Sequence, residues 1–273
     1  MTLTTTTPRY VTYDRLASVR SLNLFSAQIH WHGIHQHETP YADGFPTQNQ
    51  CPIPTNNVMQ YEWIAEPPGS TFYHAHFHAQ TVDGLHGPLI IEDEPGTFPH
   101  KYDEELVIIL GDEYNRTSWV IENYLETPDP LGIPRVDPFP NNGLMCVYDE
   151  KSSPGSATPS CSKSPTGEGF NIDFVPGKVY RLRIICLSLV AGYMFSIDEH
   201  KMQVVTADFS VLDGSTTVDA FPIHVSSGCD LRSPQLILSN IDRSTVRCPG
   251  HRQARRQAGR FFLDQGYCAT PVW

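Results

Sequence analysis

The sequence lacks an apolar run long enough to cross a bilayer as a helix. The best candidate, residues 184–195, is interrupted by Ser188 and Gly192, and it falls well short of the roughly 20 apolar residues that a spanning helix needs. Positive charge is also scarce, because 19 Lys and Arg face 30 Asp and Glu, for a net charge of -11. Nucleic-acid-binding proteins present basic surfaces. The sequence therefore predicts no membrane span and no nucleic-acid partner.

Cysteine is not rare in this chain, but its spacing follows no recognisable motif. The seven cysteines are scattered and form neither a Cys-x-x-Cys pair nor a dense disulfide framework, so the sequence alone cannot pair them. Residues 1–10 are rich in threonine and lack the apolar core and the cleavage site of a secretory signal peptide. We therefore expect no signal peptide in this chain, so that either the protein is cytosolic or its true start is missing.

Short apolar runs dominate the rest of the chain. They are rich in Val, Ile, Tyr and Phe and are separated by 23 prolines and 19 glycines, a pattern typical of many short strands joined by turns. We predict an all-β protein with a domain boundary near residue 98. Residues 126–170 are rich in Pro, Gly and Ser, and we expect a long loop there before strand patterns resume for the second domain, residues 99–228.

The composition changes after residue 228. Residues 243–260 hold six arginines and no acidic residue, in a chain that is otherwise acidic. We expect residues 229–273 to be an atypical tail, either disordered or translated out of frame; the alternative is a basic binding arm.

Eight of the twelve histidines lie between residues 30 and 86, and seven of these eight make up four His-x-His pairs, with His76 shared by two of them. Residues i and i+2 of a strand point to the same face, so each pair presents two imidazoles on one side of a sheet. Two such strands side by side make a metal site. The residues that we predict to bind metal are His30, His32, His74 and His76.

All-imidazole sites favour copper, because sites for redox-inert zinc usually add a thiolate or a carboxylate. Ligand roles are less certain for His35, His37, His78 and His86, of which His78 is expected to face solvent or to support a ligand. Four further histidines stand alone and are assigned structural roles: His100, His200, His224 and His251.

Three segments together resemble a known family. The runs QIHWHGIHQ, TPYADGFPTQNQCPI and GSTFYHAHFHAQTVDGLHGPLIIED are similar to the first two copper-binding segments of the multicopper oxidases, the group of laccases, ferroxidases and ascorbate oxidases. A weaker similarity to the second cupredoxin domain continues through VPGKVYRLRIICLS and VDAFPIHV. The resemblance implies two cupredoxin-like Greek-key β-sandwich or barrel domains, the first (residues 1–98) lacking its N-terminal strands and the second incomplete.

The resemblance also implies roles for individual residues. His30 would bind a type 2 copper, while His32, His74 and His76 would bind the two type 3 coppers. Asp43 falls where the family has a carboxylate that assists proton delivery during oxygen reduction; the alternative is a turn residue in Ala-Asp-Gly. Cys51 sits where many laccases have a disulfide cysteine, with Cys146 or Cys161 as candidate partners.

Other parts of the family pattern are missing. The type 1 copper site needs a His, Cys, His set, which the family carries in a third cupredoxin domain, and this sequence contains no His-Cys-His segment. Four of the eight cluster ligands are present. We therefore expect a copper-dependent oxidoreductase that oxidises phenols or similar small reducing substrates with dioxygen in its full-length form, secreted as its family is. This chain would then be an inactive fragment unless a third domain is supplied.

The sequence is also compatible with other functions. The chain could be a non-catalytic copper-binding cupredoxin module, or a ferroxidase- or ascorbate-oxidase-type member of the family. A cupin-like site that adds Glu38 to His30 and His32 is a weaker alternative, because it leaves His74 and His76 unexplained.

Overall fold

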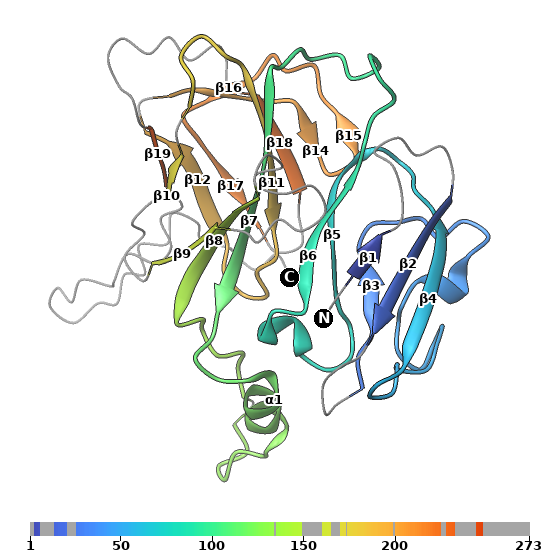
Figure 1. Cartoon of the computed structure of the whole chain (residues 1–273). Helices are drawn as coiled ribbons and strands as arrows, with labels where there is room; N and C mark the ends of the chain where they lie inside the picture. The colour runs from blue at the N-terminus through green and yellow to red at the C-terminus, as the bar shows by residue number, and fades with distance from the viewer. Residues whose placement is uncertain are drawn as a thin grey trace, which may run out of the picture.

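The computed structural model describes residues 3–5, 14–20, 26–133, 135–148, 160–164, 170–172, 174–198, 200–224, 228–232 and 244–247. These residues form strands, one α-helix and two 3-10 turns, so the prediction of an all-β fold is confirmed (Figure 1). None of the described helices is long and apolar enough to span a membrane. The elements of the first half are β1 (Leu3–Thr5), β2 (Asp14–Arg20), β3 (Ile29–Trp31), η1 (Pro40–Ala42), β4 (Val58–Ile64), β5 (Gly69–Ala75), η2 (Gln80–Asp83) and β6 (His86–Ile91).

Two three-stranded sheets make up the first half, in the orders β1-β2-β4 and β3-β5-β6. In β4, Tyr61 and Trp63 are buried while their neighbours Gln60 and Glu62 are exposed, as the two-residue period of a strand requires. Both rings pack on Trp31 of β3, with ring centroids 5.4 and 5.3 Å away. The apolar core therefore lies against one face of β3 and leaves the other face to the residues on either side of Trp31.

The second half is built around a seven-stranded sheet of order β16-β13-β18-β11-β7-β8-β9, with a four-stranded sheet β10-β19-β12-β17 and a hairpin β14-β15. β7 and β11 pair in parallel, whereas the other pairs of the large sheet are antiparallel. The bounds are β7 (Glu104–Glu113), α1 (Ser118–Glu126), β8 (Asn142–Tyr148), β9 (Ser160–Ser164), β10 (Phe170–Ile172), β11 (Tyr180–Cys186), β12 (Tyr193–Ile197), β13 (Met202–Val204), β14 (Thr206–Ala207), β15 (Ser210–Val211), β16 (Thr217–Val218), β17 (Ala220–Ile223), β18 (Gly228–Arg232) and β19 (Ser244–Arg247).

Strand β11 is buried along its whole length, including two arginines. Arg183 is fully buried and lies 2.8 Å from a Glu105 carboxylate oxygen and 3.2 Å from one of Glu92. It also donates a hydrogen bond to Ser70 Oγ at 3.0 Å. A buried charge is tolerated only when it is paired in this way. Because Ser70 and Glu92 belong to the first half, Arg183 connects the two halves of the chain.

The structure corrects three expectations about local structure. Residues 126–170 are not simply a long loop, because they contain β8 and β9, and α1 ends at the first of them. Part of the arginine-rich stretch is ordered as β19, which pairs with β10 and β12; the remainder of the stretch lies outside the described residues. Strands β1 and β2, which sequence patterns did not indicate, extend the sheet of β4.

One disulfide joins adjacent strands. Cys146 of β8 and Cys161 of β9 face each other in the strand register and are bonded, while Cys51 is a free, exposed thiol. Neither candidate partner of Cys51 is therefore available to it. The sequence could not reveal the bond between Cys146 and Cys161, because β9 lies within a stretch whose composition is typical of a loop.

Candidate metal centre

The histidines gather on one face of the sheet β3-β5-β6, which we call the histidine sheet. His30 of β3 lies directly opposite His74 of β5, and His74 lies opposite His86 of β6. Residues directly opposite in antiparallel strands present their side chains on the same face. Trp31 points to the other face and is buried in the core. The strand register thus converts two sequence-distant His-x-His pairs into one cluster.

Three of the predicted ligands have nitrogens within 4.8 Å of one another: His30, His32 and His74. The ring of His76 completes the group, with its centroid 5.5 Å from those of both His30 and His74. Imidazole is a common ligand for copper, zinc, iron and nickel. The structure therefore brings together all four histidines that the sequence singled out.

Asp43 lies beside the cluster. With the proton on Nδ1, His30 donates a hydrogen bond to the backbone oxygen of Asp43 at 2.7 Å, and the Asp43 carboxylate lies 3.3 Å from the same nitrogen. This leaves Nε2 of His30 unprotonated, the form that can bind a metal. Gly44 permits the approach, because a Cβ there would lie 1.8 Å from the oxygen of Ile29. The turn and β3 can pack this closely only with glycine at position 44.

The other rings are held by their own neighbours. His32 stacks on Phe72, with centroids 4.3 Å apart and an interplanar angle of 15°. Nδ1 of His74 lies 3.0 Å from the oxygen of Ala75, and Phe45 packs against His76 at a centroid distance of 4.2 Å. Contacts of this kind restrict the rotation of the three rings.

Burial favours the neutral form of three of these imidazoles, His32, His74 and His76. It lowers the pKa of His74 to about 3, with the nearby histidines acting in the same direction. Burial and the neighbouring His30 also lower the pKa values of His32 and His76. A neutral imidazole has a free lone pair, which is the state in which histidine binds metals.

The remaining histidines have other surroundings. His37 is mostly exposed and lies 3.9 Å from Glu38, and Glu38 is absent from the cluster within the described residues, so the cupin-like ligand set is not assembled. His86 is partly buried, with an Nδ1 that lacks a hydrogen-bond partner. His35 is exposed, while Nε2 of His100 and Nδ1 of His200 contact backbone oxygens. His224 is exposed, and His251 lies outside the described residues.

Sequence patterns missed a clamp between α1 and the segment that follows His76. Glu122 of α1 accepts a hydrogen bond from the backbone N–H of Ala79 at 2.5 Å and lies 3.3 Å from His78. In return, Asp83 accepts hydrogen bonds from the backbone N–H and the hydroxyl of Ser118, at 2.9 and 2.5 Å. Figure 1 shows α1 beside the end of the segment between β5 and β6. We call these reciprocal contacts the acid clamp.

Replacing Asp83 with alanine is expected to destabilise the chain by about 1 kcal/mol, the usual contribution of a side chain that caps a helix N-terminus. Thr117, the N-cap residue of α1, makes no capping hydrogen bond through its side chain. Asp83 therefore supplies that interaction from outside the helix. Urea unfolding of both proteins measures the difference. Asp219, an exposed acid that contacts Lys201, is the control, and an equal loss for Asp219→Ala would argue against the capping role.

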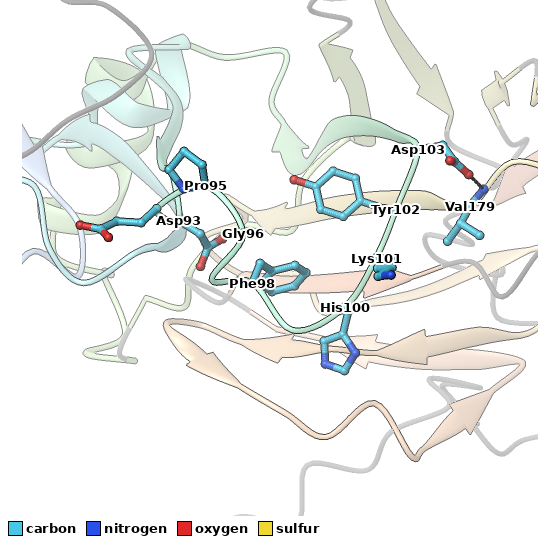
Figure 2. A pocket seen from close by; sticks show the side chains of 10 residues that line it. Asp93, Pro95, Gly96, Phe98, His100, Lys101, Tyr102, Asp103 and Val179 are labelled. Atoms are coloured by element: carbon cyan, nitrogen blue, oxygen red, sulfur yellow. Dashed lines mark hydrogen bonds between the residues drawn. The ribbon is translucent and has the colours of Figure 1, made fainter.

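One cavity of the described residues lies away from the clustered histidines. It is a groove of about 500 Å³ on the segment between the two halves (Figure 2). Beneath it, the guanidinium of Arg181 lies 3.7 Å from the centroid of Phe98 and 3.2 Å from the Asp93 carboxylate. The groove contains none of the clustered histidines, so its wall belongs to the connection between the halves rather than to the candidate metal centre.

Comparison with known proteins identifies the family. Two models described as multicopper oxidase match residues 18–96 and 104–230. Laccase-2 of Thanatephorus cucumeris is 33% identical over 216 residues, covering 77% of this chain and 34% of the relative. The iron multicopper oxidase fer1 of Mycosarcoma maydis is 33% identical over 196 residues, covering 67% and 30%. The chain thus spans about a third of the length of these relatives.

Solved structures agree with this result. The laccase from Botrytis aclada superimposes with a TM-score of 0.64 at 30% identity, covering 80% of this chain and 39% of the laccase. Fet3p, a multicopper oxidase that functions in iron import, superimposes with a TM-score of 0.66 at 25% identity, covering 81% and 37%. The cupredoxin-like fold, the strand patterns and the clustered histidines all lie within the matched regions. The chain belongs to the multicopper oxidase family.

Proposed function

We propose that this chain provides half of the copper centre at which a multicopper oxidase reduces dioxygen to water. The observation that carries the proposal is the convergence of His30, His32 and His74 within 4.8 Å, with the His76 ring alongside. His30 would hold the type 2 copper, and His32, His74 and His76 the type 3 coppers. Membership of the family implies copper as the cofactor.

The donor set fits copper. All four side chains are imidazoles, with burial lowering the pKa values of His32, His74 and His76, and no thiolate or carboxylate replaces them among the clustered donors of the described residues. When bound, the coppers would pass to dioxygen the electrons that a reducing substrate supplies. The contribution of this chain is to hold the four imidazoles in fixed positions.

Asp43 is proposed to move protons. Reduction of dioxygen to two waters consumes four protons and four electrons, so a carboxylate at the cluster can pass protons from solvent. The Asp43 side chain is partly exposed, at 28%, and lies 3.3 Å from His30 Nδ1. It therefore has access both to water and to the edge of the cluster, as a proton-transferring group requires.

The reducing substrate of the full protein is proposed to be a phenol or a similar small donor, as the laccase relatives suggest, or Fe(II), as the names of the iron multicopper oxidases suggest. We propose two cupredoxin domains, residues 1–98 and 99–228, that require the type 1 copper and the remaining cluster ligands from a third domain. Secretion is supported by the Cys146–Cys161 bond, because stable disulfides are typical of oxidising compartments.

Copper stoichiometry of the purified full chain tests the proposal. We expect Cu²⁺ to bind with an EPR signal typical of nitrogen ligands, without an intense blue absorption band and without oxygen uptake on a phenolic donor or on Fe(II). A chain that binds no copper would contradict the half-centre. An intense blue band with turnover would instead show that type 1 ligands are present that the sequence pattern does not reveal.

A further inference from the structure

The hairpin β14-β15 of the second half reaches the histidine sheet of the first. Its turn residues are Asp208 and Phe209. The turn is fixed to β18, because the backbone N–H of Asp208 donates to the oxygen of Gly228 at 2.8 Å and the N–H of Gly228 donates to Asp208 Oδ1 at 2.9 Å. The hairpin tip is therefore held at a fixed place relative to the large sheet.

The ring of Phe209 fills a slot between two glycines. A Cβ on Gly33 would lie 2.6 Å from Cε2 of Phe209, and a Cβ on Gly69 would lie 2.6 Å from its Cδ1. Real Cβ contacts are essentially never this short, so only glycine at both positions admits the ring. Phe209 also packs against the apolar core of the first half.

The two glycines belong to the two histidine-bearing segments. Gly33 directly follows His32, whereas Gly69 begins β5, the strand that carries His74. The backbone of His32 is bonded on both sides: its N–H donates to the oxygen of Phe72 at 3.0 Å, and its oxygen accepts from the Thr71 hydroxyl at 2.6 Å. Phe209 therefore lies between the two segments that carry the His-x-His pairs. From this position its ring can fix the distance between them.

We propose that Phe209 is a positioning residue for His32, and that its ring sets the spacing between the strand segments that carry the two His-x-His pairs. The inference rests on the proposed copper centre and extends it. Residues of the second half that touch no metal would then tune the site in the first. Supporting groups around metal ligands typically contribute about 10- to 100-fold in affinity.

The test is a Cu²⁺ titration of the full chain and of Phe209→Ala, followed by EPR. We expect Phe209→Ala to bind Cu²⁺ at least about 10-fold more weakly, with altered hyperfine values, and Phe209→Leu to recover most of the affinity because it retains much of the volume. Val211→Ala, at a half-exposed position on the same hairpin, should leave binding unchanged.

A second control separates positioning from stability. Phe221 is buried in the core of the second half, so Phe221→Ala should lower the melting temperature without changing the Cu²⁺ affinity of the folded chain. Wild-type affinity in Phe209→Ala, or equal weakening in Phe221→Ala, would overturn the inference without contradicting the proposed copper centre.

A wild-type chain that binds no Cu²⁺ would overturn both proposals. If Phe209→Ala does not fold, wild-type affinity and spectra in both Phe209→Leu and Phe209→Val would equally reject the positioning role.

Discussion

Replacing His74 with alanine is expected to weaken Cu²⁺ binding by at least about 100-fold, since a lost ligand should cost no less than the upper range for lost supporting groups. His74 is the central residue of the cluster, because it lies opposite both His30 and His86 in the strand register. Its ring centroid is 5.4 to 5.6 Å from those of His30, His32 and His76.

The matched control is His37→Ala. His37 belongs to the neighbouring His-x-His pair, and its side chain is 71% exposed, so its loss should leave Cu²⁺ affinity unchanged. Both variants are measured by isothermal titration, with circular dichroism to show that the strands persist. Equal affinities for the two variants would mean that copper binds elsewhere on the chain.

Replacing Arg183 with alanine is expected to destabilise the chain by about 3–5 kcal/mol, the usual effect of removing one partner from a buried ion pair. Its guanidinium is fully buried and contacts Glu92 and Glu105. The change would leave the Glu105 carboxylate with a more distant partner, Arg181 at 3.9 Å. It would also remove the hydrogen bond to Ser70. The midpoint of guanidinium chloride unfolding measures the loss.

Lys201→Ala is the comparison for Arg183. Lys201 pairs with Asp219 at 2.9 Å, but both side chains are more than half exposed, and exposed pairs contribute only about 0–1 kcal/mol. We therefore expect a small shift for Lys201→Ala and a large one for Arg183→Ala. Similar shifts in the two variants would mean that the buried arginine network contributes little to holding the halves together.

The sequence indicated which histidines share a face because that signal is local. His-x-His has the period of a strand, so the shared face of His30 and His32, or of His74 and His76, follows from spacing alone. The pairing of His30 with His74 could not be predicted in the same way, because register depends on the turn between strands that lie more than thirty residues apart. The resemblance to a known family implied that these histidines share one copper cluster, whereas their register is known only from the structure.

The structural features that sequence patterns did not predict share a physical cause. Helix α1 takes its cap from Asp83, an acid 35 residues away, so no local capping signal marks its start. Strand β9 is tied to β8 through Cys146–Cys161, although its sequence of Ser, Lys and Cys reads as loop. Phe209 owes its role to two glycines that are distant in sequence. Where a neighbour far along the chain decides the outcome, patterns over ten or fifteen residues carry little information.

The acid clamp has a consequence for recombination between family members. Asp83 and Glu122 lie on opposite sides of the break between the two matched regions, residues 97–103, and each accepts hydrogen bonds from the other side. A chimera joined at that break inherits only one of the two acids from each parent. It keeps both sets of contacts between α1 and the segment that follows His76 only if each parent supplies the matching acid.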